Sequence, residues 1–167
     1  MQAASSMKKN AQGKRIAADQ AILELEQFLP YRLSVLSNTA SRAIADLYES
    51  RYGLSIAEWR TMAVLGSYDG IAAREVAERT AMDKVAVSRA LARLIADGRV
   101  RRRTAEHDKR RSVLGLTAKG WKVYAEVAPL ALEHEKRLLS HLNAEERRWL
   151  AHILDRLWQA ELEEIAK

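Results

Sequence analysis

The sequence predicts a mainly α-helical protein that contains one short β-hairpin. Its 167 residues are rich in Ala, Leu, Arg and Glu but include only 7 Gly and 2 Pro, a composition typical of helical proteins. Over most of the chain, apolar residues recur at the three- and four-residue spacing of amphipathic helices. Two short runs of β-compatible residues between positions 100 and 116 interrupt this pattern and indicate the hairpin.

The composition also excludes several classes of protein. The chain has no cysteine, which excludes disulfides, zinc–thiolate sites and thiol switches. No apolar run is long enough to span a membrane. The first fifteen residues carry four Lys or Arg but no apolar segment, so they do not resemble a secretory signal. We therefore expect a cytoplasmic protein without a membrane partner, in which residues 1–17 form a disordered basic tail.

Residues 18–52 are predicted to form the N-terminal helices. Apolar residues have helical spacing from Ile22 onward. Pro30 suits the first turn of a helix, because an N–H at that position has no partner within the helix. A long helix is therefore expected from Pro30 to about Arg51, where Gly53 ends it. Its apolar face would carry Leu33, Leu36, Ala40, Ala43, Ile44 and Leu47.

Two shorter helices follow in the prediction. Ser55 and Glu58 form a capping box, so a helix starts at this point and runs to about Ser67. A turn at 68–70 separates it from a short helix over residues 73–80, for which the sequence offers no side-chain N-cap.

The next helix, predicted over residues 83–97, has the most informative pattern. Its buried stripe would consist of Val87, Leu91, Leu94 and Ile95. The opposite face combines cations with small residues, which allow a helix to approach a grooved partner closely. We expect this face to contact DNA through Lys84, Val85, Ser88, Arg89 and Arg93.

The charge of the chain is concentrated around this helix. Residues 84–111 hold ten Lys or Arg and three acidic residues, a net charge of +7, whereas the whole chain carries +6. The remainder of the chain is therefore close to neutral. A concentrated basic patch attracts a polyanion, so double-stranded DNA is the expected partner, and a merely solvated charged face is the alternative.

Residues 53–117 together are predicted to form a winged helix-turn-helix lobe. Ala77, Ala81 and Val87 fall at the spacing of the helix-turn-helix pattern. Ala81 stands where glycine is usual, which costs about 1 kcal/mol if this residue is left-handed. The hairpin of Val100–Thr104 and about Arg111–Leu116 would then be the wing. The recognition helix of such a lobe lies in the major groove, and the tip of the wing reaches the minor groove.

The residues of the wing resemble the signature of the MarR family of transcriptional regulators. Asp108-x-Arg110-x5-Leu116-Thr117 matches the family pattern D-x-R-x5-L-T, while "DKVAVSRALARLIADGRV" and "IAEWRTMAVL" resemble two of its helices. The resemblance covers about residues 28–160. It implies that Arg110 enters the minor groove, with Lys109 and Arg111 also on the DNA. It further implies that Asp108 holds the tip in shape and that Thr117 caps the next helix.

Residues 118–167 are predicted to form C-terminal dimerisation helices. The first would span about Ala118–Leu142, with a kink or break near Glu126 caused by Pro129. Asn143 and Glu146 form a second capping box, which opens the last helix. Its apolar stripe is too broad for the lobe to cover and indicates association. The expected interface contains Leu150, Ile153, Leu154, Leu157 and Trp158.

Together with residues 18–52, these helices would build a homodimer, as the family resemblance also implies. A two-fold dimer reads a pseudo-palindromic operator. The expected fold class is therefore mainly α, with a winged helix-turn-helix lobe, a two-stranded wing, and a dimerisation lobe made of N- and C-terminal helices.

The resemblance also implies an effector, because the family often binds small aromatic acids or related metabolites beside the DNA-binding lobe. We expect a small anionic aromatic effector, either an aromatic acid or an aromatic acyl-CoA thioester, that releases a repressor from DNA. Arginine suits a carboxylate or phosphate, and the candidate residues are Arg32, Asn38, Arg42 and Trp59. Alternatively, the arginines form surface or interface ion pairs and Trp59 belongs to the core.

Other functions find little support in the sequence. The four histidines do not share a helical face with carboxylates in a metal-binding arrangement, and there is no Gly-rich phosphate loop or nucleophile elbow. We expect no metal, no cofactor and no enzymatic activity. An architectural DNA-binding or protein-interaction module without an effector remains the alternative to a ligand-responsive regulator.

Overall fold

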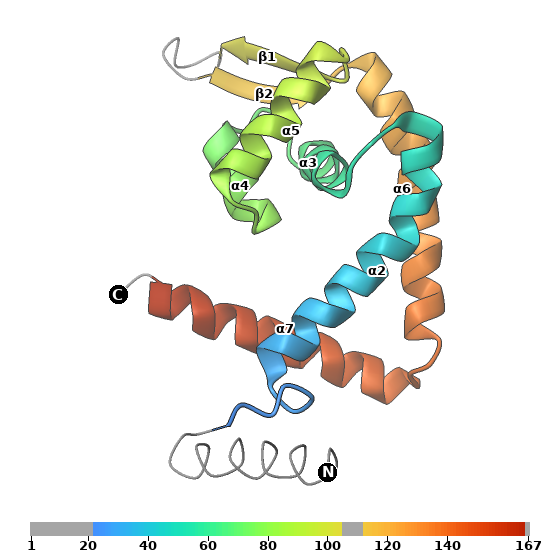
Figure 1. The fold of residues 1–167 in the computed structure, drawn as a ribbon, viewed down its shortest axis with the longest axis vertical. Helices are drawn as coiled ribbons and strands as arrows, with labels where there is room; N and C mark the ends of the chain where they lie inside the picture. Colours follow the sequence, from blue (N-terminus) through green and yellow to red (C-terminus); the bar gives the residue numbers. More distant parts are fainter. Residues whose placement is uncertain (1–21, 105–111, 166–167) are drawn as a thin grey trace, which may run out of the picture. The chain divides into compact units, whose positions relative to one another are not determined.

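The computed structural model describes residues 22–104 and 112–165. Within these ranges it contains six α-helices and one antiparallel sheet of two strands, which confirms the mainly α class (Figure 1). The chain divides into two units, Met1–Ser41 and Arg42–Lys167, so that α2 crosses from one to the other. In chain order the elements are α2 (Leu29–Tyr52), α3 (Ile56–Ser67), α4 (Ala73–Thr80), α5 (Lys84–Ala96), β1 (Val100–Thr104), β2 (Ser112–Leu116), α6 (Ala118–Leu139) and α7 (Ala144–Ile165).

In the first unit, the helix begins at Leu29, so Pro30 lies in its first turn as predicted. Residues 22–28 are not helical. A turn precedes the helix, and the amides of Gln27 and Phe28 both donate to the carbonyl oxygen of Glu24. The helical spacing that starts at Ile22 therefore does not correspond to a helix before Leu29. A helix that continued through Pro30 would lose an N–H and place the proline ring against the preceding turn.

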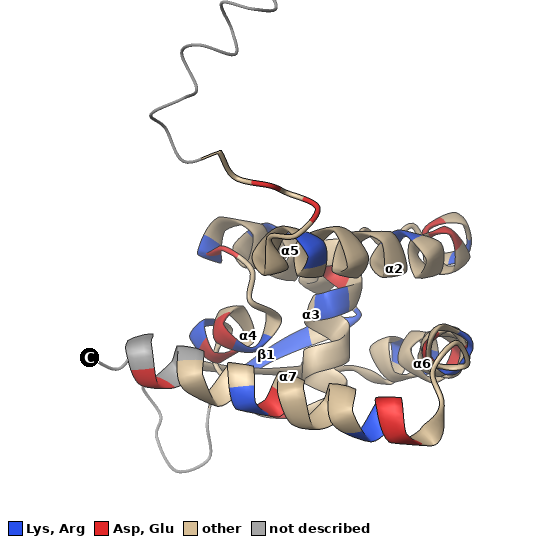
Figure 2. Ribbon diagram, turned by 90° about the horizontal axis from the view of Figure 1, so that it is seen from below, with Lys and Arg blue, Asp and Glu red and all other residues tan. Residues whose placement is uncertain are grey.

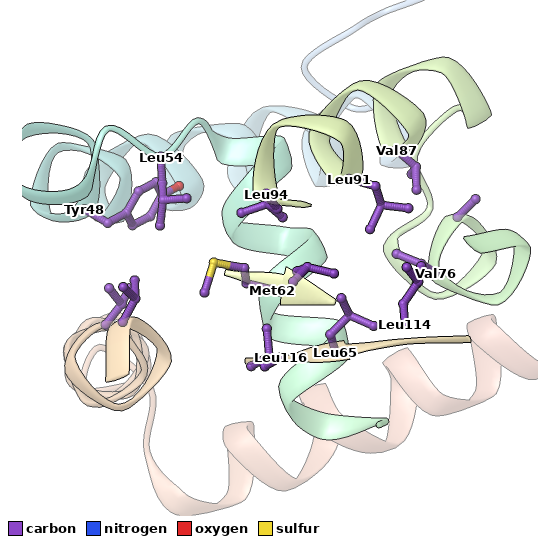
Figure 3. Packing of buried hydrophobic residues seen from close by; sticks show 14 of the residues in the cluster. Tyr48, Leu54, Met62, Leu65, Val76, Val87, Leu91, Leu94, Leu114 and Leu116 are labelled. Atoms are coloured by element: carbon purple, nitrogen blue, oxygen red, sulfur yellow. The ribbon is translucent and has the colours of Figure 1, made fainter. Parts of the chain in front are cut away.

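The second unit has its core around α3, which contacts α4, α5, α6 and β2. Met62 and Leu65 of α3 are fully buried, and Figure 3 shows side chains from the surrounding elements packed around them. The last turns of α2 contribute Ala45 and Tyr48, and burial raises the pKa of the Tyr48 hydroxyl to about 12. On the predicted apolar face, Ala40 and Ile44 are half-buried and Leu47 is 40% exposed. The buried residues Ala45 and Tyr48 each directly follow a residue of that face.

Local capping signals fix where the helices begin. The Ser55 hydroxyl accepts from the Glu58 amide, and the Glu58 carboxylate accepts from the Ser55 amide at 2.7 Å, which completes the predicted capping box of α3. Asp83, which was counted within the next helix, is instead its N-cap and accepts from two amides of α5 at 2.9 Å. Asn143 and Glu146 form the predicted box at α7.

Pro129 does not break α6, so one of the two outcomes predicted near Glu126 is wrong. The other outcome, a kink, stays a prediction. The helix is continuous from Ala118 to Leu139, and Pro129 lies inside it. A proline removes only one amide donor, and the hydrogen bonds of the neighbouring turns are sufficient to carry the helix past it. The helix ends at Leu139 with Ser140 as its C-cap, earlier than the predicted Leu142.

The hairpin is attached to the rest of the lobe along β2. Its strands pair from Val100 opposite Leu116 to Thr104 opposite Ser112. On the other side of β2, the Leu114 amide donates to the Ile71 carbonyl at 2.9 Å, and the Gly70 amide donates to the Leu114 carbonyl at 3.0 Å. These bonds fix the base of the hairpin against the turn between α3 and α4. The tip, residues 105–111, lies outside the described residues.

Candidate DNA-binding surface

The turn between α4 and α5 has the geometry of a helix-turn-helix. Ala81 has φ 50° and ψ 33°, a left-handed conformation, and is the one described non-glycine residue with positive φ. Ala77 and Val87, on either side of the turn, are buried in the contact between the two helices. The predicted pattern is therefore present, with alanine in the position that usually requires glycine.

One face of α5 is buried and the other is exposed and cationic. Val87, Leu91 and Leu94 are buried as predicted, together with Ala90, and Ile95 is half-buried. Figure 2 shows the Lys and Arg positions on α5 and along β1. The predicted DNA-facing residues of this helix are all exposed: Lys84, Val85, Ser88, Arg89 and Arg93.

A groove of about 410 Å³ runs between α4, α5 and β1. Apolar side chains that include Leu91 and Val87 line it, and cations from three elements lie around it: Arg74, Lys84 and Arg102. Arg74 and Arg102 were not among the DNA-contacting residues predicted from the sequence. Side chains of successive strand residues point to opposite faces of a sheet. This alternation along β1 could have identified Arg102 from the sequence.

The wing is held by an ion pair near the tip end of β1 and by a hydroxyl at its root. Arg103 of β1 donates to the Asp69 carboxylate at 2.7 Å, and both side chains are partly exposed. Thr117 is the N-cap of α6: its hydroxyl accepts from the Gly120 amide and donates to the Gly98 carbonyl at 2.7 Å. The end of α5 and the start of α6 are thereby joined. Four predicted wing residues lie outside the described part of the chain: Asp108, Lys109, Arg110 and Arg111.

The residues predicted to bind an effector have different environments. Arg32 and Asn38 are exposed in the first unit, and Arg42 is exposed in the second. Trp59 is half-buried within a row of aromatic rings, with ring centroids 5.7 Å from Tyr48 and 6.0 Å from Tyr124. The row continues to Trp121, whose side chain is 44% exposed. Trp59 thus belongs to the rim of the core, and the row reaches the surface.

The predicted dimer-interface residues of α7 are all exposed in the single chain. Their exposed fractions lie between 38% and 60%, for Leu150, Ile153, Leu154, Leu157 and Trp158.

Over the ranges 22–104 and 112–165, no helix is long and apolar enough to cross a membrane. The same residues contain no group of three or more His, Asp or Glu side chains placed to hold a metal ion.

Comparison with known proteins decides the family. A model of the MarR family matches residues 52–111. The HTH-type transcriptional regulator BilQ of Clostridium symbiosum (strain WAL-14163) is 32% identical over 105 residues, which are 63% of this chain and 73% of BilQ. The chain belongs to the MarR family. It is a DNA-binding transcriptional regulator with a winged helix-turn-helix, and the MarR-family relatives found are regulators rather than enzymes.

Solved MarR-family structures share the fold. The MarR/EmrR family regulator from Acinetobacter sp. ADP1 has a TM-score of 0.76 at 24% identity, over 85% of this chain and 99% of that chain. MepR of S. aureus, solved as a complex with DNA, has a TM-score of 0.71 at 21% identity, over 81% of this chain and 97% of that chain. The winged helix predicted for this MarR-family chain is therefore confirmed.

Proposed function

We propose that this regulator binds, as a homodimer, a pseudo-palindromic operator in double-stranded DNA and represses transcription until a small anionic aromatic effector releases it. The observation that carries the DNA-binding part is the exposed face of α5. Its cations are exposed and lie opposite the apolar stripe of Val87, Leu91 and Leu94, so they can contact DNA without any loss of core packing.

Different residues of α5 would contact the bases and the phosphate backbone. Side chains near the start of a recognition helix contact base edges, so Lys84, Ser88 and Arg89 would read the major groove. Arg93 lies in the last turn of α5 and would contact the phosphate backbone. Arg110, with Lys109 and Arg111 beside it, would enter the minor groove, where the negative potential attracts arginine.

The dimer proposal rests on exposed apolar surface. Large apolar side chains are exposed on α7 and also along the first turns of α2, where Leu36 is 53% exposed. Apolar surface of this extent is typical of an association interface. A second copy of the chain would cover it and would place two recognition helices on successive turns of the DNA, about 34–36 Å apart.

The effector proposal is supported by the aromatic row and by the family. Tyr48, Trp59, Tyr124 and Trp121 form a row with one exposed end, which suits an aromatic ring. PcaV from Streptomyces coelicolor, of similar fold (TM-score 0.63, 21% identity), was solved in complex with its natural ligand. That Arg32, Asn38 and Arg42 bind the anion of an aromatic acid or an aromatic acyl-CoA thioester stays a separate prediction from the sequence.

A footprinting experiment tests the DNA-binding part. The protein is incubated with a library of genomic fragments, and bound fragments are sequenced and footprinted. A discrete protected palindrome supports a sequence-specific regulator. Uniform coating at all sequences would instead establish the architectural alternative.

The effector part is tested by screening aromatic acids and their CoA thioesters for release of the operator. A ligand releases DNA only if it binds the DNA-incompetent arrangement more tightly, and a tenfold loss of DNA affinity requires about 1.4 kcal/mol of coupling. Arg32→Ala and Arg42→Ala should lose the response but keep DNA binding. If both respond normally, the site is elsewhere, and Trp121→Ala tests the exposed end of the aromatic row.

A further inference from the structure

Glu58 is a buried carboxylate whose two oxygens face different partners. Its residue is 4% exposed. Oε2 accepts from the Ser55 amide at 2.7 Å and from the Ser55 hydroxyl at 2.9 Å, and so completes the capping box of α3. Oε1 lies 3.8 Å from Nη1 of Arg93, on α5. Oε2 of Glu58 therefore caps α3, whereas Oε1 faces the guanidinium of Arg93 on the recognition helix.

Arg93 itself has little packing around it. Its side chain is 76% exposed, and it lies at a groove of about 500 Å³ between α3 and α5. The other residues of the groove are small or polar: Ser55, Ala57, Ala86, Arg89, Ala90 and Ala92. Apart from Glu58 and Arg89, the described residues of this groove have side chains too small to restrict Arg93. The fixed carboxylate of Glu58 is therefore the feature of this groove that gives the guanidinium a preferred direction.

We propose that Glu58 is a positioning residue for DNA recognition, which holds the Arg93 guanidinium beside the α3–α5 groove before DNA arrives. This inference rests on the proposed contact of Arg93 with the DNA backbone. Ordering a long side chain on binding costs free energy, and a side chain that is already ordered avoids part of that cost. Glu58 can order the Arg93 side chain because its own carboxylate is fixed by two hydrogen bonds from Ser55.

A purely structural role for Glu58 makes a different prediction. If Glu58 only caps α3, its replacement lowers stability, and any effect on DNA binding is independent of Arg93. If Glu58 positions Arg93, its effect on DNA binding requires Arg93 to be present. A double-mutant cycle measures this difference directly.

The experiment compares wild type, Glu58→Gln, Arg93→Ala and the double variant, all as full chains, by operator binding over a range of salt concentrations. Glu58→Gln keeps an oxygen for the cap but removes the charge. We expect operator binding about three- to tenfold weaker per dimer, which corresponds to about half of the free energy needed to order one long side chain in each subunit. The salt slope should stay as in wild type, because the arginine is still present. Arg93→Ala should flatten the slope by about 1.8 per dimer, and adding Glu58→Gln to it should cause no further loss.

Two further variants control for folding and capping. Glu146→Gln removes the charge at the same capping position of α7, where the carboxylate accepts from the Asn143 amide at 2.7 Å, and it should leave DNA binding unchanged. Glu58→Asp keeps the charge but shortens the reach to Arg93, so it should weaken binding like Glu58→Gln, and it serves if Glu58→Gln does not fold. Wild-type affinity in a folded Glu58 variant, or an equal loss in the Arg93→Ala background, would overturn the positioning role. Wild-type affinity and slope in Arg93→Ala would instead show that Arg93 does not contact DNA.

Discussion

Asp69 occupies the space that a side chain at position 115 would need. A Cβ added to Gly115 would lie 2.1 Å from Oδ1 of Asp69, while Oδ2 of the same carboxylate accepts from Arg103 at 2.7 Å. Gly115 of β2 thus leaves room for Asp69, whose carboxylate pairs with Arg103 of β1. The ion pair between Asp69, in the turn after α3, and Arg103, in the wing, therefore requires a glycine at position 115, although Gly115 is not a member of the pair.

Gly115→Ala should therefore displace Asp69 without unfolding the protein. The aspartate is half-exposed and can rotate away, and a partly exposed ion pair contributes at most about 1 kcal/mol. We expect a loss below about 1 kcal/mol in thermal or urea unfolding. Gly120→Ala is the contrast, because its Cβ would lie 2.1 Å from the backbone oxygen of Arg99, which cannot rotate away. It should cost about 1–3 kcal/mol. Equal losses in the two variants would contradict this account.

The buried and exposed faces of α5 should separate stability from DNA binding. Leu91 is 3% exposed, so Leu91→Ala should cost about 2–5 kcal/mol of unfolding free energy. Ser88 and Arg89 are exposed, so replacing either with alanine should leave the melting temperature nearly unchanged but alter operator affinity and sequence preference. Melting curves and binding to a panel of operator variants measure both effects, and the reverse pattern would mean that the helix faces are exchanged.

Ala81→Gly should stabilise the protein. A left-handed alanine costs about 1–2 kcal/mol, and glycine removes that cost but adds about 0.4–1 kcal/mol of chain entropy to the unfolded state. We expect a net gain of about 0.5–1 kcal/mol in chemical denaturation. Ala92→Gly, in the exposed interior of α5, is the control and should lose about 1 kcal/mol. A loss in both variants would show that strain at Ala81 is absent.

Arg110→Ala should weaken operator binding strongly in a protein that still folds. Removing one DNA contact per subunit should flatten the dependence of log K on log salt by about 1.8 for the dimer, at about 0.9 per contact. Binding isotherms at several salt concentrations give the slope. Arg156→Ala removes one cation from the exposed surface of α7 and serves as the control with unchanged slope. Unchanged affinity of a folded Arg110→Ala protein would exclude a DNA contact by this residue.

Leu154→Gln combined with Leu157→Gln should produce monomers or aggregates. These side chains are 44% and 40% exposed in the single chain, and the proposed dimer buries them. Light scattering at micromolar concentration gives the mass, and Asp155→Asn on the same helix should retain the wild-type state. A wild-type protein that is already monomeric under these conditions would refute the dimer.

Local signals in the sequence predicted most helix boundaries. Ser55, Asn143 and Gly53 each act within one turn of the chain, so their effect on the backbone can be read without knowing the fold. The left-handed turn at Ala81 followed from its place in a short pattern. The break considered at Pro129 was wrong, because the strength of a helix on both sides of a proline is set by neighbouring contacts that the sequence does not show.

Long-range contacts could not be predicted from the sequence, for a different reason. Glu58 and Arg93 are 35 positions apart, and Asp69 and Arg103 are 34 apart. Nothing in either segment alone indicates the partner, since a capping glutamate and a solvated arginine have the same local pattern with or without the pair. The cations of α5 were predicted from periodicity, but the groove that one of them, Lys84, lines together with Arg74 and Arg102 required the packing of three elements.

On the proposed DNA-binding surface, the exposed arginines of β1 and the cations of α5 would also determine how the protein meets its target. DNA attracts this end of the lobe from a distance comparable to the Debye length, about 8–10 Å at physiological ionic strength, so collisions that present α5 and β1 are favoured before any base is read. The rate of encounter with DNA is raised by this steering and falls as salt is added. Once in contact, the same phosphate attraction holds the protein loosely at any sequence and lets it move along the duplex. With the proposed surface, the arrangement of charge on the lobe would therefore shorten the search for the operator.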